Sequence, residues 1–431
     1  MISIPQLHQR ASTLNGISTD TRSLPPGCLF FALKGPNFDA NAFAAQALEH
    51  GAGAVVVDDA SVVKDDRYLL VPDTLRALQE LARHHRRMFD IPVLAITGTN
   101  GKTTTKELVH AVLSADRSTL STQGNLNNHI GVPLTLLRLG SEHRIAVIEM
   151  GANKPGDIAE LCAIAEPTHG LITNVGRAHL EGFGDFQGVL RTKTELYDHL
   201  RRHRGQVFVN ADDALLMARS HGIARTTYGM NSTSDLRGNA TGDGPFLAFI
   251  FGTASMAPRT VTSRLVGDYN LPNALAAACI GHHFGVPDTI IAQAIAGYAP
   301  GNNRSQFNDT GRNHLVLDAY NANPSSMHAA LLNFQSMQAA RPKLVILGDM
   351  LELGGTSEEE HRSIVDQIEQ LGLDAILVGP IFQSTPGASA AKRFGDAKTA
   401  LSALEAERPE GKLILVKGSR GIRLETLVPA L

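Results

Sequence analysis

The chain has 431 residues, of which 43% are hydrophobic and 19% charged, so it can form two to four domains with buried cores, and disorder or a small disulfide scaffold is excluded. Lysine and arginine total 39 against 42 for aspartate and glutamate, and this net charge of -3 gives no reason to expect a nucleic-acid partner. The N-terminus lacks an apolar signal core, and no run approaches the roughly 20 apolar residues of a membrane span. Three cysteines without CxxC spacing suit a reducing compartment. We expect a cytoplasmic monomer, without membrane insertion, that acts on small molecules.

Short runs rich in valine, isoleucine and leucine alternate with helical patterns between residues 51 and 420, and this alternation predicts an α/β fold. Almost all of the runs are unbroken, so helices should cover both faces of mostly parallel sheets. In chain order, the expected strands are Ala54–Val57, Pro92–Thr97, Ile145–Glu149, Leu171–Asn174, Leu315–Leu317, Lys343–Leu347, Ala375–Val378 and Lys412–Val416.

Two stretches predict domain boundaries. The basic run HHRRMF, near residues 84–90, ends just before the Pro92 strand, and residues 300–312 combine glycine and proline with no apolar periodicity. Residues 230–259 contain β-prone pieces such as FLAFIFG and are interpreted as a hairpin excursion within the middle domain. We therefore expect three α/β domains, covering residues 1–88, 89–304 and 305–431.

The stretch ITGTNGKTTTKE (96–107) places a glycine loop between a buried strand and a helix. Glycines let backbone N–H groups approach phosphates, a lysine supplies a cation, a threonine hydroxyl can bind Mg²⁺, and the helix N-terminus adds its dipole. Ile96 departs from the general P-loop pattern, which has a glycine there. The sequence still predicts an ATP-phosphate cradle formed by Gly98, Thr99, Asn100, Gly101, Lys102, Thr103 and Thr104.

Other polar residues lie at strand ends. Glu149 ends one strand and His179 follows another, so both are candidate Mg²⁺ ligands at the sheet edge where α/β folds bind ligands, although a lone histidine can equally be structural. In the last third, Asp318, Asp349 and Lys417 each follow a strand; each alone could be a turn residue, but together they suggest a functional face. A polar face joined by a linker to an ATP-binding domain predicts closure over a substrate.

Several phrases across the chain resemble the Mur ligases: GTNGKTTTKE (98–107), GNLNNHIGVPLTLLRL (124–139), IEMGAN (148–153), AHLEGFG (178–184), DAYNANPSSM (318–327), ILGDMLELG (346–354) and VKGSRG (416–421). The resemblance implies a UDP-sugar-binding N-terminal α/β domain, a central P-loop-type domain and a Rossmann-like C-terminal α/β domain. It also implies an ATP-dependent, ADP-forming amide ligase of peptidoglycan precursor synthesis. The GTNGKT phrase is shared with folylpolyglutamate synthetases and fixes only the class.

The resemblance also implies roles for single residues. Lys102, Thr103 and Glu149 would hold ATP phosphates and a first Mg²⁺, and His179 a second. Lys193 matches the carbamylated lysine of the family, although without the resemblance it reads as an exposed helical lysine. Arg304, Asp318, Tyr320 and Asn321 would meet the nucleotide's ribose and base. The expected substrate contacts are Asn125, Asn127, Asn128, Ser325, Lys417 and Arg420, with Asp20, Thr21, Arg22, Lys34 and Asn37 on the UDP-sugar platform, where Arg22 and Lys34 would balance a diphosphate.

We expect the two substrates besides ATP to be UDP-MurNAc-tripeptide and D-Ala-D-Ala. The alternatives are a family member that adds a single amino acid, a folylpolyglutamate synthetase, and a non-catalytic UDP-sugar or nucleotide-binding regulator. Two departures from the family pattern fall in the N-terminal part: Thr21 replaces a serine, and Asn41 replaces a common histidine.

Overall fold

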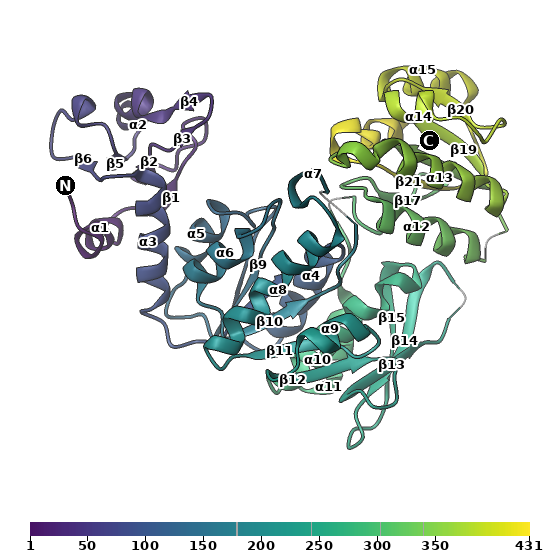
Figure 1. Cartoon of the computed structure of the whole chain (residues 1–431), viewed down its shortest axis with the longest axis horizontal. Coiled ribbons are helices and arrows are strands. Elements are labelled where there is room, and N and C mark those ends of the chain that lie inside the picture. The colour runs from purple at the N-terminus through teal and green to yellow at the C-terminus, as the bar shows by residue number, and fades with distance from the viewer. Residues whose placement is uncertain (178–179, 243, 302, 339) are drawn as a thin grey trace.

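The computed structural model describes residues 1–177, 180–242, 244–301, 303–338 and 340–431, and these form three α/β units in a row (Figure 1). The N-terminal unit (purple) and the C-terminal unit (green to yellow) both adjoin the central one, and helix α3 (Thr74–Arg86) leads from the first unit to the second. Within these described residues, no helix is long and apolar enough to cross a membrane.

The N-terminal unit is a parallel sheet of order β1-β2-β5-β6 with helices α1 (Ile4–Ala11), α2 (Ala44–Glu49) and α3. A small hairpin of β3 (Lys34–Gly35) and β4 (Phe38–Asp39) projects from it. Along α3, Leu78 and Leu81 pack into the N-terminal core, whereas Ala82 packs into the central core, so this one helix belongs to both units. The sheet strands are β1 (Ile17–Ser18), β2 (Leu29–Phe31), β5 (Ala54–Val57) and β6 (Tyr68–Leu70).

The central sheet has the order β15-β14-β13-β12-β11-β10-β7-β9-β8, and it is parallel from β8 to β13. Its strands are β7 (Val93–Thr97), β8 (Thr119–Ser121), β9 (Ile145–Glu149), β10 (His169–Ile172), β11 (Gln206–Asn210), β12 (Ala224–Gly229), β13 (Leu236–Ala240), β14 (Phe246–Gly252) and β15 (Arg259–Val266). The last pairs, β13–β14 and β14–β15, are antiparallel, so the hairpin excursion expected at residues 230–259 is an extension of this sheet.

Helices cover both faces of the central sheet, as its unbroken apolar strands require. One core combines alternate strand residues such as Leu94 and Ile96 with α4, α10 and α11, and the other combines Val93 and Ala95 with α5, α6 and α8. The helices are α4 (Lys102–Ser114), α5 (Gly131–Leu136), α6 (Asp157–Ala165), α7 (Leu180–Phe183), α8 (Phe186–Arg202), α9 (Ala214–Arg219), α10 (Leu271–His283) and α11 (Asp288–Gly297).

The C-terminal sheet has the order β16-β17-β21-β18-β19-β20, with only β16 antiparallel to its neighbour among the described strands. Its strands are β16 (Gln306–Asp309), β17 (His314–Asp318), β18 (Lys343–Gly348), β19 (Asp374–Val378), β20 (Lys392–Phe394) and β21 (Leu413–Lys417). Helices α12 (Pro324–Ser336), α13 (Ser357–Leu371), α14 (Pro380–Ser384) and α15 (Ala397–Glu407) pack on it.

The expected strands match the observed ones within one residue, except the strand expected at Leu171–Asn174. It is observed as β10, two residues earlier, because Thr173 and Asn174 leave the sheet to bond the loop after β7. The linker expected at residues 300–312 is also shorter, because β16 forms within it.

Candidate active site

The parallel register brings the predicted loop and carboxylate to one edge of the central sheet. Ile96 of β7 pairs with Glu149 of β9, and Thr97 pairs with Ile172 of β10. The carboxyl ends of the three strands therefore lie level, and the segments that follow them meet in the crevice where α/β sheets bind ligands.

The loop of residues 98–101 takes a conformation that only glycine tolerates at its two ends. Gly98 has φ +143° and Gly101 has φ +78°. A Cβ on Gly98 would lie 2.0 Å from Thr173 Oγ1, and one on Gly101 would lie 2.6 Å from Asn273 Oδ1. The loop thus enters α4 tightly packed, and the first-turn N–H groups of α4, which lack partners within the helix, face the crevice.

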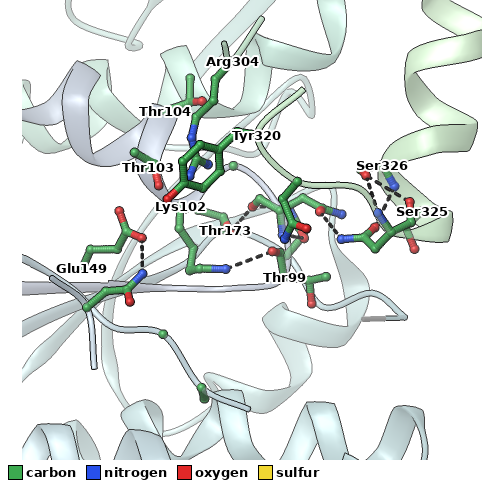
Figure 2. A pocket seen from close by; sticks show the side chains of 18 of the residues that line it. Thr99, Lys102, Thr103, Thr104, Glu149, Thr173, Arg304, Tyr320, Ser325 and Ser326 are labelled. Carbon is green, nitrogen blue, oxygen red and sulfur yellow. Dashed lines mark hydrogen bonds between the residues drawn. The ribbon is translucent and has the colours of Figure 1, made fainter. Parts of the chain in front are cut away.

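Lys102 bends back over this loop, as Figure 2 shows. Its Nζ donates to the carbonyl oxygens of Gly98 (2.7 Å) and Thr99 (3.0 Å). Burial lowers its pKa to about 8, with Glu149 opposing the shift and Arg304 adding to it. The ammonium is therefore held beside the loop, where it can meet a phosphate.

Glu149 presents one free carboxylate oxygen. The side chain is only 1% exposed, its Oε1 accepts a 2.8 Å hydrogen bond from Asn127 Nδ2, and its Oε2 is buried without a partner. Burying a charged carboxylate oxygen without a partner raises the free energy of the folded protein unless a cation binds to it. The donor chemistry therefore fits a hard cation such as Mg²⁺.

Lys193 is not the exposed helical lysine that its sequence context alone suggests. It lies on α8 with 3% exposure, and its Nζ is 5.8 Å from the ring centroid of Phe183. Burial lowers its pKa far below the usual value, and the neighbouring charge of Lys102 lowers it further. The other predicted metal ligand, His179, lies outside the described residues. Among those described, no three histidine, cysteine or acidic side chains are grouped as a metal site.

The C-terminal unit supplies the opposite wall. Strands β17 and β21 place Asp318 beside Lys417, and Lys417 Nζ donates to Asp318 Oδ2 at 2.5 Å. The guanidinium carbon of Arg304 lies 3.7 Å above the ring centroid of Tyr320, and that of Arg420 lies 5.2 Å from it. Figure 2 shows the Arg304 side chain running to the ring of Tyr320.

A cavity of about 1140 Å³ lies between these walls and collects most of the predicted residues. Gly98, Lys193 and Arg420 are not in its lining, but each interacts with a residue that is. Lys102 donates a hydrogen bond to Gly98 and its charge lowers the pKa of Lys193, and Arg420 contacts Tyr320. The predicted residues that line it are Thr99, Asn100, Gly101, Lys102, Thr103, Thr104, Asn125, Asn127, Asn128, Glu149, Arg304, Asp318, Tyr320, Asn321, Ser325 and Lys417.

The predicted residues of the N-terminal unit do not line this cavity. Arg22 is exposed and forms an ion pair with Asp20 at 2.7 Å, which lowers the pKa of Asp20 to about 2. Lys34 pairs with Asp58 at 2.8 Å, and Asn41 donates to the same carboxylate at 2.7 Å. The cations expected to balance a diphosphate are thus already partnered within their own unit.

Asp349 corrects the expectation of a functional face of three residues. It is completely buried, and its carboxylate accepts hydrogen bonds from the backbone N–H groups of Ile381 (2.9 Å) and Phe382 (2.8 Å) at the start of α14. Asp318 and Lys417 line the cavity, whereas Asp349 holds the fold of the C-terminal unit.

Sequence reasoning missed a group of asparagines in the lining, including Asn174, Asn270, Asn273 and Asn323. Asn273 accepts a hydrogen bond from Thr105 at 3.0 Å and donates to Asn270 at 2.9 Å. The phrase DYNLPN, with two asparagines three residues apart at the start of a helix, was the available signal.

A glycine loop at a helix N-terminus, a lysine bound to that loop and a buried carboxylate with a free oxygen define an ATP-binding α/β enzyme. Family models match along the chain: "Mur ligase family, catalytic domain" at residues 13–86, "Mur ligase middle domain" at 96–281 and "Mur ligase, glutamate ligase domain" at 303–420. The chain belongs to the Mur ligase family, as its motifs predicted.

Named relatives are similar over nearly the whole chain. The UDP-N-acetylmuramoyl-tripeptide–D-alanyl-D-alanine ligase of Escherichia coli (strain K12) is 37% identical over 97% of this chain and 94% of its own length. The crystal structure of MurF from Acinetobacter baumannii has a TM-score of 0.86 at 33% identity, covering 96% of this chain and 93% of that one. MurF ligase from Thermotoga maritima, in complex with ADP, has a TM-score of 0.85 at 27% identity and covers 97% of both chains.

Proposed function

We propose that this chain joins D-Ala-D-Ala to UDP-MurNAc-tripeptide with hydrolysis of ATP to ADP and phosphate, a step of peptidoglycan precursor synthesis. Full-length similarity to ligases named for this reaction supports it. The observation that carries the chemistry is the pairing of the Lys102 loop with the buried, half-satisfied carboxylate of Glu149. A non-catalytic regulator could also hold Mg²⁺ on Glu149, and it differs from the ligase in releasing no phosphate.

The reaction brings two anions together, and the site can neutralise both. The substrate carboxylate oxygen attacks the γ-phosphorus of ATP and ADP leaves, which gives an acyl phosphate. The dipeptide amine then attacks the acyl carbon, loses a proton, and phosphate leaves from the tetrahedral intermediate. Lys102 and the N–H groups at the start of α4 bind phosphate oxygens in this proposal. No enzyme nucleophile is required.

Glu149 and Thr103, with His179 and Lys193, would hold Mg²⁺, which would screen the phosphates during the transfer. Lys193 would serve as a carbamate. Its buried ammonium beside Lys102 is disfavoured, so the neutral amine is available to take up CO₂, and the resulting anion would face the Lys102 cation. The carbamate would thus replace an ammonium charge that repels Mg²⁺ with two oxygen atoms that can bind it.

The remaining assignments follow the position of each residue. Asp318, Tyr320 and Asn321 would contact the nucleotide from the C-terminal wall, with Lys417 holding Asp318 in place, and Arg304 would do so from the end of the central unit beside Tyr320. Ser325 and Arg420 would meet the dipeptide or the γ-phosphate, together with Asn125 and Asn128. Asp20, Thr21, Arg22, Lys34 and Asn37 would bind the UDP group, and Arg22 and Lys34 would first exchange their present carboxylate partners. We also propose domain boundaries after residues 88 and 304, a monomer, and a cytoplasmic location, which three buried free thiols support.

A phosphate-release assay with ATP, UDP-MurNAc-tripeptide and D-Ala-D-Ala tests this proposal. We expect release only when all three are present with Mg²⁺. Release without the dipeptide would indicate an ATPase, and no release with either a lysine-containing or a diaminopimelate-containing tripeptide would contradict the ligase assignment.

A further inference from the structure

Asparagine side chains connect the phosphate loop to the C-terminal unit. Asn323 Nδ2 donates a 2.7 Å hydrogen bond to Asn100 Oδ1, which joins residues 223 positions apart in the chain. Both residues line the cavity, and Asn323 is only 7% exposed. This bond therefore crosses between the walls that must meet around a nucleotide.

On the C-terminal side, the direction of the Asn323 amide is fixed. Asn323 is the N-cap of α12, and its Oδ1 accepts from the backbone N–H of Ser326 at 2.9 Å. Pro324 follows it and favours the extended backbone that the cap requires, which is observed at φ -143° and ψ 165°. With its oxygen committed to the helix, the amide can only offer its N–H group to the loop.

On the central side, Asn100 is held by the segment after β10. Its backbone N–H donates to Asn174 Oδ1 at 3.0 Å, and its carbonyl oxygen accepts from Asn174 Nδ2 at 3.0 Å and Thr173 Oγ1 at 2.6 Å. The Asn100 backbone N–H is thus occupied within the protein, and its side-chain oxygen serves α12. These bonds make Asn100 a residue that sets the shape of the loop.

We propose that Asn174, Asn100 and Asn323 form a latch that fixes the phosphate loop and the N-terminus of α12 relative to each other, and that Asn174 and Asn323 are positioning residues for the ligase reaction. When the loop keeps the shape set by Asn174, the Asn100 oxygen meets the Asn323 amide and the C-terminal wall is held over the cavity. A displaced loop loses this bond, so the position of one unit depends on the loop of the other.

The test uses Asn323→Ser, Asn100→Ala and the double variant. Serine keeps an oxygen to cap α12 but removes the amide that reaches Asn100. The matched control is Asp396→Ser, which makes a similar change at the N-cap of α15, where Asp396 accepts from Thr399 N at 2.7 Å. The control tests whether changing an N-cap in the C-terminal unit is by itself enough to alter the central loop.

The first readout is amide hydrogen exchange of the ligand-free protein, which does not depend on any activity. We expect peptides covering residues 98–101 to exchange about fivefold faster in Asn323→Ser, the size of one lost hydrogen bond, and to be unchanged in Asp396→Ser. Unchanged exchange in Asn323→Ser, or an equal increase in the control, would overturn the latch.

The second readout is the turnover number, and it rests on the proposed ligase function. We expect about a fivefold lower kcat in each single variant and no further loss in the double variant, because both remove the same bond. Multiplicative losses in the double variant would overturn the coupling. A wild-type protein without ligase activity would instead refute the proposed function, while the exchange readout would still decide on the latch.

Discussion

Replacing Glu149 by glutamine should separate the effect of this buried charge on protein stability from its effect on catalysis. The amide is nearly isosteric, and its oxygen can keep the 2.8 Å hydrogen bond from Asn127. Its NH₂ group then takes the position of Oε2, which has no partner in the protein. A ligand that would attract a cation becomes a donor that repels one.

The two consequences have opposite directions. Losing a buried charge should leave the free energy of unfolding of the ligand-free protein within about 1 kcal/mol of wild type, or raise it. Losing a metal ligand should lower kcat at least about 100-fold, or about 2.7 kcal/mol of transition-state stabilisation. Excess Mg²⁺ should recover only part of the loss.

The assay is coupled ADP formation over a range of Mg²⁺ concentrations, with chemical denaturation for stability. Glu160→Gln is the control, because that carboxylate lies in the same cavity but is exposed, so that water can solvate its charge. It should change kcat at saturating substrate less than about twofold. A Glu149→Gln variant with wild-type turnover and wild-type Mg²⁺ dependence would refute the reasoning.

The other residues give further predictions. Lys102→Ala should lower turnover by several orders of magnitude with the fold intact by circular dichroism; a near wild-type rate would remove the nucleotide assignment. Because the pKa of Lys102 is lowered to about 8 and phosphate binds the charged form, ATP affinity measured by calorimetry should weaken as the pH rises through about 8, and this loss should be absent in Lys102→Ala. Lys193→Ala should be nearly inactive and partly rescued by short carboxylic acids, whereas an active variant would exclude the carbamate. Small-angle scattering should show compaction when an ATP analogue and UDP-tripeptide are both added, because the predicted UDP-binding residues of the N-terminal unit lie outside the cavity; an unchanged radius of gyration would count against closure of that unit.

Local patterns predicted the most buried strands of each sheet and one side of the site. Buried parallel strands leave unbroken apolar runs, and a strand end followed by a glycine loop and lysine has few other uses, so the strands and the positions of Lys102 and Glu149 could be read directly. Asp318 and Lys417 were also found, because each follows a strand at the same sheet edge.

Features that depend on distant parts of the chain were not predictable. Asp349 has the same local pattern as Asp318, but the first turn of α14 packs against it and its backbone N–H groups donate to both carboxylate oxygens. The burial of Lys193 depends on how α8 packs, and the bond between Asn100 and Asn323 depends on two units meeting. In each case the local sequence does not indicate which distant residues the fold brings into contact.

Mass spectrometry of the product tests the central claim most directly. The enzyme is supplied with ATP, Mg²⁺ and UDP-MurNAc-tripeptide, and with either D-Ala-D-Ala or D-Ala at equal concentration. We predict the mass of the tripeptide substrate plus the dipeptide less one water, with little product from D-Ala, whose carboxylate would lie about 3.5 Å short of its receptor. Equal rates with the two acceptors, or a product extended by a single alanine, would contradict the account and indicate a ligase that adds one amino acid.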